Sequence, residues 1–309
     1  MNVLPSVDLL LEKTSESFRV LEPLAHYREA LENTKVRPDG RAFLETRELS
    51  VSGNTIGTAD GSAEVRIGST CVVAGIKLEI GEPNNINEPA HGNLDIDVQL
   101  QPFCSQRHKF GAYSEEALTM GEFVRRTILS KGAIDLADLC IEENVCVWSM
   151  KVDVVCLDDD GSVVDAALIA TYAALYSLEL PALRTTPNGN GGGRHAGLAV
   201  VSKHESLPEG MEIKYPTRRL PTYQVPYCMS FGVFEKKVLI ADPSAGEENL
   251  VNPTFVCVGV VSEDECKGNM SMYKVGGDGV ALSVMKDAFA ESRRSRMREL
   301  QACLRKALA

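Results

Sequence analysis

The chain has 309 residues, 44% of them hydrophobic and 24% charged, so it is long enough to bury a sizeable core and to form two domains of roughly 150 residues. Its formal net charge of −11 excludes a broad, non-specific affinity for nucleic acid, although a local basic patch remains compatible with RNA contact. The first residues are not basic and no run of about 18 uncharged apolar residues occurs, so we expect a soluble, intracellular protein without a signal peptide or membrane span.

The first third of the chain is predicted to form a helical extension followed by strands. Apolar residues recur at intervals of three and four through residues 1–34, and Pro23 is expected to divide this segment into two helices. The sequence RPDGR at 37–41 is typical of a turn. Residues 51–80 indicate strands joined by turns, and Leu94–Leu100 alternates strictly with polar residues, which predicts a strand with one buried face.

Two helices and another strand are expected in the middle of the chain. A helix is predicted from Glu115 to Ser130, with Ser114 as its N-cap and Gly132 just after its end. A strand near 145–157 leads into the turn DDDGS. The helix that follows, Val163–Leu178, is apolar on all sides and is therefore expected to be buried.

The last third repeats this style after a glycine-rich joint at 188–194, whose composition indicates flexibility. A long closing helix is expected after the sequence GGDG, with an apolar side formed by Leu282, Met285, Phe289, Met297, Leu300 and Leu304. Two strand-rich halves, each ending in a helix, predict an α+β, two-lobed fold. The expected strands of the last third are Tyr227–Phe234, Val238–Ile240, Thr254–Val261 and Ser271–Val275.

Nine cysteines are scattered along the chain, several of them inside apolar runs, where a thiol behaves as a small hydrophobe. Because no CxxC pair occurs, neither a zinc site nor a redox motif is predicted, and we expect reduced, buried thiols. No metal and no cofactor is expected.

Three kinds of polar cluster are candidates for chemistry. GGDGVA at 276–281 is compatible with a phosphate cradle at a helix N-terminus, but a plain turn at the start of a helix explains it as well. Paired carboxylates can hold Mg²⁺ or act as general acid and base, yet the turn positions of these ones favour solvated side chains. The basic pairs are more typical of solvated faces than of ligand sites. The carboxylates are Asp158, Asp159, Asp160, Asp242, Glu247 and Glu248, and the basic stretches are Arg107–His108–Lys109, Arg125–Arg126, Arg218–Arg219 and Arg293–Arg294.

Several segments, taken in order, resemble the exosome branch of the RNase PH family. They are EPLAHYREALENTKVRPDGR, TADGSAEVRIGSTCVVAGIK, FCSQRHKF with the EEA-led helix after it, CLDDDGSVVDAALIATYAAL, LIADPSAGEE and GGDGVALSVMK, which together span most of the chain from Glu22 to Arg305. The resemblance implies an N-terminal helical extension at 1–35, a first RNase PH-like domain at 36–187, a flexible loop at 188–195 and a second domain with the C-terminal helix at 196–309.

The resemblance also implies a function and a place for its chemistry. Active members of the family cleave RNA from its 3′ end with phosphate as the nucleophile, which they hold with a glycine–serine–x–arginine-like turn, and they use carboxylates of the second domain as acid or metal ligands. Here the turn is Gly161-Ser162-Val163, with an apolar residue where arginine is expected, and a valine cannot supply the charged donor that phosphate needs. Asp242 and Glu248 match acidic positions, but the next aspartate aligns near Thr254. No catalytic residue is therefore predicted.

RNA contact is expected from basic residues of the first domain. In archaeal relatives, a non-catalytic partner lends arginines from a first-domain helix to a shared site; the corresponding positions here are Glu122 and Arg126, of which only Arg126 matches. The candidate RNA-contacting residues are Arg126, Arg107 and Lys109.

The resemblance favours a non-catalytic structural subunit of a six-membered exosome ring, which supports 3′–5′ RNA processing by threading single-stranded RNA. Its implied partners are other RNase PH-like subunits, RNA-binding cap subunits and the RNA, with no membrane, and the implied location is the nucleus and nucleolus as well as the cytoplasm. An active phosphorolytic 3′–5′ exoribonuclease is the alternative, opposed by Val163 and Thr254. A free-standing RNA-binding protein is opposed by the acidic charge and the absence of RNA-binding motifs.

Overall fold

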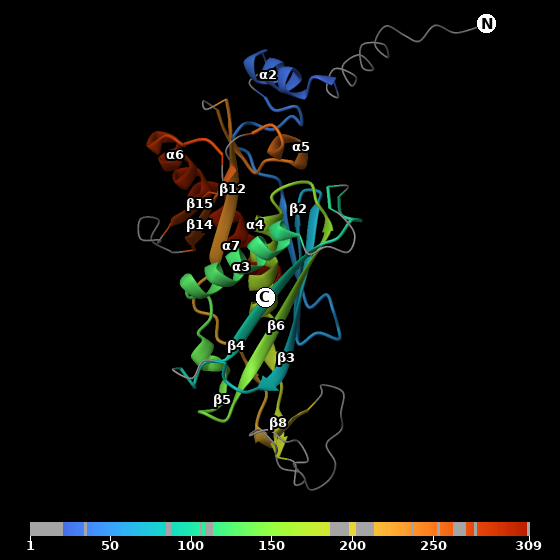
Figure 1. Cartoon of the computed structure of the whole chain (residues 1–309), viewed down its shortest axis with the longest axis vertical. Helices are drawn as coiled ribbons and strands as arrows, with labels where there is room; N and C mark the ends of the chain where they lie inside the picture. Colours follow the sequence, from blue (N-terminus) through green and yellow to red (C-terminus); the bar gives the residue numbers. More distant parts are fainter. Residues whose placement is uncertain are drawn as a thin grey trace, which may run out of the picture.

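A six-stranded sheet forms the centre of the first half of the chain in the computed structural model (Figure 1). Its strand order is β1–β2–β3–β6–β4, with β5 paired to β6, and β4 runs parallel to β6 while the other pairs are antiparallel. The strands are β1 (Leu49–Gly53), β2 (Gly61–Ile67), β3 (Thr70–Gly81), β4 (Asn93–Leu100), β5 (Cys140–Glu142) and β6 (Cys146–Asp158). The structure describes residues 21–33, 36–84, 88–105, 107–108, 114–185, 198–201, 213–235, 238–251, 254–261, 270–274 and 277–307.

The strand predictions of the first half are confirmed. In β4, Leu94, Val98 and Leu100 are buried while Asp95 is exposed, because alternate side chains of a strand point to opposite faces. The turn between β2 and β3 contains Gly68 with a φ of +57°, a left-handed conformation that glycine adopts without a steric penalty.

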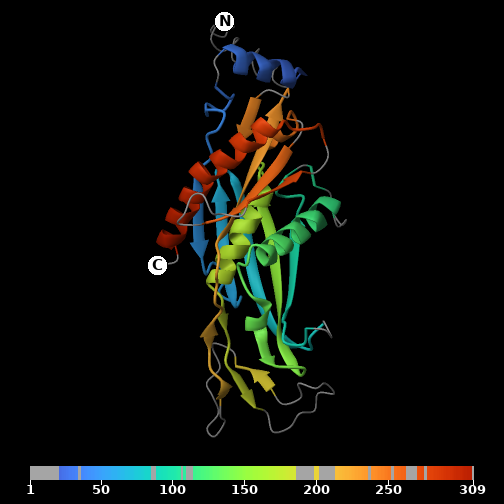
Figure 2. The same ribbon diagram turned by 90° about the vertical axis from the view of Figure 1, so that its left-hand side faces the viewer.

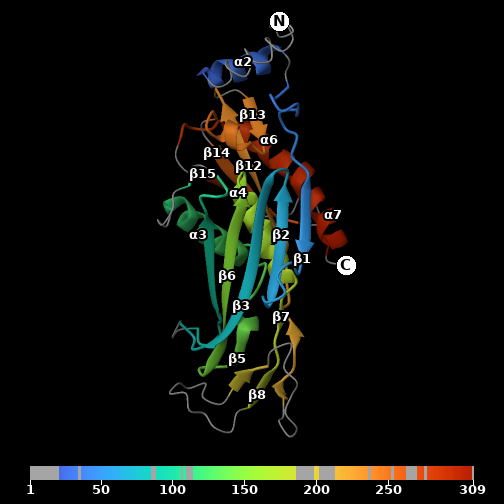
Figure 3. The same ribbon diagram turned by 90° about the vertical axis from the view of Figure 1, so that its right-hand side faces the viewer.

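Two helices cover one face of the sheet (Figures 2 and 3). They are α3 (Glu115–Ser130), which packs on β4, and α4 (Val163–Tyr176), which lies between the sheet and strand β12 of the second half. Every residue of α4 except Val164 and Tyr176 is buried, so the predicted buried helix is confirmed. The main hydrophobic core contains residues of both halves of the chain. Because α4 is buried between them, it joins the two halves.

The second half has a four-stranded antiparallel sheet in the order β13–β12–β14–β15, covered by α6 (Figure 2). α6, a π-helical segment and α7 form one continuous helix, whose last part packs against β1 of the first sheet (Figure 3). The elements are β12 (Pro226–Phe234), β13 (Val238–Ala241), the short α5 (Ala245–Glu248), β14 (Thr254–Val260), β15 (Ser271–Lys274), α6 (Leu282–Ser292), the π segment (Arg293–Met297) and α7 (Arg298–Ala307).

The predicted apolar side of the closing helix is only partly correct. Met297 and Leu300 are buried, but Leu282 is 68% exposed. Leu282 is the first residue of α6. Phe289 packs with the second sheet as predicted, and the inward face of α6 also contains Val284 and Ala288, which were not predicted.

The N-terminal helix α2 (Pro23–Asn33) lies at one end of the molecule and small strand pairs lie at the other (Figure 1). α2 begins at Pro23, as predicted, because proline is tolerated in the first turn, where its missing N–H is not needed. The predicted helix before Pro23 and the glycine-rich segment 188–194 are outside the described residues. Among the described residues, no helix combines the length and apolarity required to cross a membrane. The small strands are β7 (Glu179–Leu180), β8 (Leu183–Thr185), β9 (Leu198–Val200), β10 (Ile213–Tyr215) and β11 (Arg218–Arg219).

Candidate functional site

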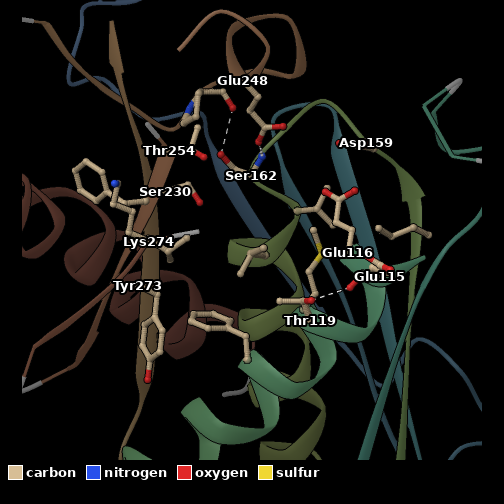
Figure 4. Close-up of a pocket in the computed structure, with 18 of the residues that line it drawn as sticks. Glu115, Glu116, Thr119, Asp159, Ser162, Ser230, Glu248, Thr254, Tyr273 and Lys274 are labelled. Carbon is tan, nitrogen blue, oxygen red and sulfur yellow. Dashed lines mark hydrogen bonds between the residues drawn. The ribbon is translucent and has the colours of Figure 1, made fainter. Parts of the chain in front are cut away.

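A cavity of about 740 Å³ lies between the two halves, where α3, the start of α4 and strands β14 and β15 meet (Figure 4). Glu115, Glu116 and Thr119 of α3 line one side, and Thr254 of β14 and Tyr273 and Lys274 of β15 line the other. Two of the lining residues, Phe123 and Tyr273, meet edge to face, with ring centroids 4.9 Å apart. The cavity is therefore built by both halves of the chain.

The turn that leads into α4 is the most constrained part of the cavity wall. Gly161 and Ser162 both have left-handed backbone conformations, with φ values of +85° and +56°. A Cβ on Gly161 would lie 2.5 Å from the carbonyl oxygen of Pro243 and 2.7 Å from the backbone nitrogen of Ala245. Only glycine fits at this position, because α5 and the residues before it pack directly on the turn.

The backbone amide of Ser162, the residue just before α4, is bound by a carboxylate of the second half. The Ser162 N–H donates a hydrogen bond to Oε1 of Glu248, 2.8 Å away, while the Ser162 hydroxyl donates to the carbonyl of Pro243. The other oxygen of Glu248 accepts from Nη1 of Arg107 at 3.4 Å. Burial raises the pKa of Glu248, although the Ser162 amide and the charge of Arg107 oppose this effect.

Asp159 completes this charged corner. Its carboxylate accepts hydrogen bonds from the Gly161 N–H at 3.0 Å and from Nη2 of Arg107 at 2.8 Å, and it lies 3.1 Å from Nε2 of His108. Burial alone would raise the pKa of Asp159, but the hydrogen bond from Gly161 and the nearby Arg107 outweigh it and lower the pKa. Asp159 therefore stays ionised and holds Arg107 in place.

A second charged cluster lies behind the turn, away from the cavity. Arg47 donates to both carboxylate oxygens of Asp242, at 3.0 Å from Nε and 2.7 Å from Nη2, and its guanidinium also reaches the carbonyls of Asp160 and Gly161. Burial would raise the pKa of Asp242, but the hydrogen bonds from Arg47 and the charge of Arg296 lower it to about 2. Arg296 is fully buried, and its Nη2 lies 3.7 Å from Oδ2 of Asp242.

Glu247, next to Glu248 on α5, is held by the N-terminal part of the chain. It forms an ion pair with Arg37 and accepts a hydrogen bond of 2.7 Å from the hydroxyl of Tyr27 on α2. Arg37 is only 2% exposed and also donates to the carbonyls of Ala241 and Asp242. These contacts fix α5, and with it Glu248, against the turn before α4.

The predicted solvation of the carboxylates is wrong for three of them. Asp242 is completely buried, Glu247 is 5% exposed and Asp159 is 8% exposed. Their arginine partners, Arg47, Arg37 and Arg107, lie far away in the sequence, so local turn chemistry gave no signal of the pairing. Only Asp158 is exposed, as predicted, while Asp160 and Glu248 are half-buried.

Two of the three candidate RNA-contacting residues line the cavity. Arg107 and Arg126 both line it, whereas Lys109 is outside the described residues. Arg107 is engaged with Asp159 and Glu248. Arg126 is exposed and has no hydrogen bond or ion pair with the residues that the structure describes. Glu122 pairs instead with Arg125, at 2.9 Å, on the same helix.

The two positions at which family chemistry was expected to fail both lie in the cavity lining. Val163 is the first residue of α4 and is buried, and Thr254 is the first residue of β14 and faces the cavity (Figure 4). Neither side chain carries a charge. In the described part of the chain, no three histidine, cysteine, aspartate or glutamate side chains are grouped so that they could hold a metal ion.

The described part of the GGDGVA motif, residues 277–281, precedes α6 and does not line the cavity. Gly277 has a left-handed φ of +71°, and Gly276 is outside the described residues. The helix begins only at Leu282.

Comparison with known proteins identifies the family of this two-part fold. Residues 45–181 match the model of the 3′ exoribonuclease family, domain 1. The chain is 31% identical to exosome complex component rrp43 of Schizosaccharomyces pombe, over 92% of this chain and 96% of the yeast protein. It is also 31% identical to exosome complex component Rrp42 of Saccharolobus solfataricus, over 78% of this chain and 82% of the archaeal protein.

Solved structures show the same relationship. A chain of the Archaeoglobus fulgidus exosome with RNA bound to the active site matches with a TM-score of 0.72 and 27% identity, covering 90% of this chain and 96% of that one. A chain of an archaeal exosome core matches with a TM-score of 0.70 and 25% identity, covering 94% of this chain and 99% of that one. The protein belongs to the RNase PH family.

Proposed function

We propose that this chain is a non-catalytic structural subunit of an RNA exosome ring, which supports 3′–5′ RNA processing and degradation by helping to thread single-stranded RNA. Relatives named as exosome components match almost the whole chain, including 96% of the yeast protein. The observation that carries the proposal is that Val163 and Val164, which follow Gly161-Ser162 in the expected phosphate-holding turn, and Thr254, at the expected acid position, line the same cavity without a charge.

The pairing of Asp242 with Arg47 supports the proposal that this subunit does not catalyse phosphorolysis. Phosphoryl transfer depends on positioning and on charge stabilisation, so a working site needs a free acid and a cation for phosphate. Asp242 matches an acidic position of the family, but its two oxygens are bound by Arg47 behind the turn. It faces away from any substrate in the cavity.

The proposed partners are other RNase PH-like exosome subunits in a six-membered ring, RNA-binding cap subunits and single-stranded RNA in the shared channel. Arg126 is the proposed RNA-contacting residue of the described chain, because its guanidinium lines the cavity while the neighbouring Glu122 is neutralised by Arg125. Arg107 contributes less, because Asp159 and Glu248 already engage it. Lys109 remains a candidate from the sequence.

We further propose that the chain acts in the nucleus and nucleolus and also in the cytoplasm. The proposed division of the chain is a helical extension at 1–35, a first domain at 36–187, a flexible loop at 188–195 and a second domain at 196–309. The packing of α7 on β1 means that the last part of the second domain would cover the sheet of the first.

The proposal is tested on the full-length chain purified from cells under native conditions. The expected species is several-fold larger than the 33.6 kDa chain and contains RNase PH-like exosome proteins. The purified subunit is then incubated with single-stranded RNA, phosphate and Mg²⁺, and no nucleoside diphosphates are expected. A stable monomer without exosome proteins contradicts ring membership. Phosphate-dependent RNA shortening that is lost on Glu248→Ala contradicts catalytic silence.

A further inference from the structure

The corner of the cavity at the start of α4 has the parts of an anion site, but an acidic side chain of the same chain already fills it. Helix N-termini attract anions because their first N–H groups lack partners within the helix. Here the Ser162 N–H is bound at 2.8 Å by Glu248, and the nearest guanidinium, that of Arg107, contacts the same carboxylate. The Glu248 carboxylate therefore already accepts from two donors of this corner, the Ser162 N–H and the guanidinium of Arg107.

The position of Glu248 is enforced by packing. The turn at Gly161 leaves no space for even one additional carbon atom against Pro243 and Ala245. The preceding residue of α5, Glu247, is fixed by Arg37 and Tyr27, and its side chain also accepts from the Ser244 N–H at 2.9 Å. With α5 held on both sides, the Glu248 carboxylate stays at the Ser162 amide.

We infer that Glu248 is a built-in occupant of the anion-binding corner, which closes this cavity to inorganic phosphate and to phosphate esters. This inference rests on the proposed function and deepens it, because the site is then blocked by an intrachain carboxylate as well as weakened by the missing arginine. Removing the Glu248 side chain frees the Ser162 amide and Arg107 together. Arg107 remains near the corner because Asp159 still holds it.

The test compares Glu248→Ala with Glu116→Ala in the full chain. Glu116 lines the same cavity, so its removal takes away the same negative charge without uncovering the amide of Ser162. Binding of inorganic phosphate is measured by the chemical shifts of backbone amides and by ³¹P NMR, at constant ionic strength. We expect saturable binding to Glu248→Ala that is at least about tenfold tighter than to the wild type or to Glu116→Ala, because hydrogen bonds to a charged ligand are strong.

The inference is overturned if Glu248→Ala binds phosphate no more tightly than the wild type. It is equally overturned if Glu116→Ala gains as much, because general electrostatics would then explain the effect. If Glu248→Ala does not fold, Glu248→Gln against Glu116→Gln makes the same comparison with the side-chain shape kept, and a gain specific to position 248 is expected, smaller than for alanine. In the wild type, the Ser162 amide resonance should not shift with phosphate, and a saturable shift there contradicts occupation by Glu248. Ring membership is read separately from native size, so failure of one proposal does not imply failure of the other.

Discussion

Asp242 is fully buried, and its carboxylate meets the guanidinium groups of Arg47 and Arg296. The backbone N–H of Arg47 adds a third donor at 2.8 Å. The backbone of Asp242 itself is left-handed, with a φ of +48°, which aspartate tolerates better than most residues. Asp242 therefore connects the segment before β1, the second sheet and the C-terminal helical segment.

Replacing Asp242 with asparagine is expected to lower the free energy of unfolding by about 3–5 kcal/mol, because it removes the fully buried carboxylate that pairs with both Arg47 and Arg296. Urea-induced unfolding followed by circular dichroism measures the change. Asp160→Asn is the matched control. The Asp160 side chain pairs with the same Arg47 at 3.4 Å but is 42% exposed, so its loss should cost less than about 1 kcal/mol. Equal effects of the two substitutions would contradict the structural role of Asp242.

The pH dependence of this difference has a definite sign. The pKa of Asp242 is about 2 in the folded chain, below its ordinary value of 3.8, so its ionised form stabilises the fold above that ordinary value. As the pH falls from 3.8 towards 2, the contribution is lost. The gap in unfolding free energy between the wild type and Asp242→Asn should therefore be constant from about pH 5 to 7 and shrink below about pH 4.

Such pairings could not be predicted from the sequence. Asp242 and Glu247 are more than 190 positions away from their arginine partners, Arg47 and Arg37, and no local pattern links them. Arg296 lies in a helix whose neighbouring apolar residues, Met297 and Leu300, were predicted correctly, yet the π-helical segment turns this charged residue into the core as well. The spacing of apolar residues in a sequence predicts which face of an element is buried, but it does not predict buried ion pairs.

At the scale of helices, the spacing of apolar residues was sufficient to predict the bounds of α3 and the burial of α4. The bounds predicted for α3 are those observed, and α4 was predicted to be buried because it is apolar on every side. The approach of α5 to the turn before α4 was not predictable, since it depends on the second half folding over the first. What marks this junction is Gly161, whose left-handed backbone and missing Cβ both become necessary only in the assembled fold.

Gly161→Ala is expected to lower the free energy of unfolding by at least about 2 kcal/mol, because a Cβ meets backbone atoms of Pro243 and Ala245 and alanine disfavours a φ of +85°. Thermal or urea unfolding measures the effect. Gly246→Ala is the control, because this glycine lies in α5 with no heavy atom within 4 Å of its added Cβ. Alanine in a helix is favourable, so this variant should be unchanged or up to about 1 kcal/mol more stable. A tolerated Gly161→Ala would contradict the close packing of α5 on α4.

Across the whole molecule, charge is distributed unevenly. The chain carries a net charge of −11, yet the cavity between its halves contains Arg107, Arg126 and Lys274 beside its glutamates. Arg107 is compensated by Asp159 and Glu248, and Glu122 by Arg125, while Lys274 donates a hydrogen bond to the carbonyl of Gly277. Arg126 therefore presents the most available positive charge of the described cavity wall, which suits a contribution to a shared RNA channel better than independent RNA binding.

Arg126→Glu in a reconstituted ring is expected to weaken binding of single-stranded RNA by about tenfold at low salt, because a charge-assisted contact with one phosphate is replaced by repulsion. The slope of log affinity against log salt concentration should become shallower by about 0.7–1 unit, since one fewer counterion is released. Arg66→Glu is the control: Arg66 is exposed on β2, pairs with Glu64 and does not line the cavity, so it should change the slope little. An intact ring in which Arg126→Glu leaves both affinity and slope unchanged would place Arg126 among the ordinary surface charges.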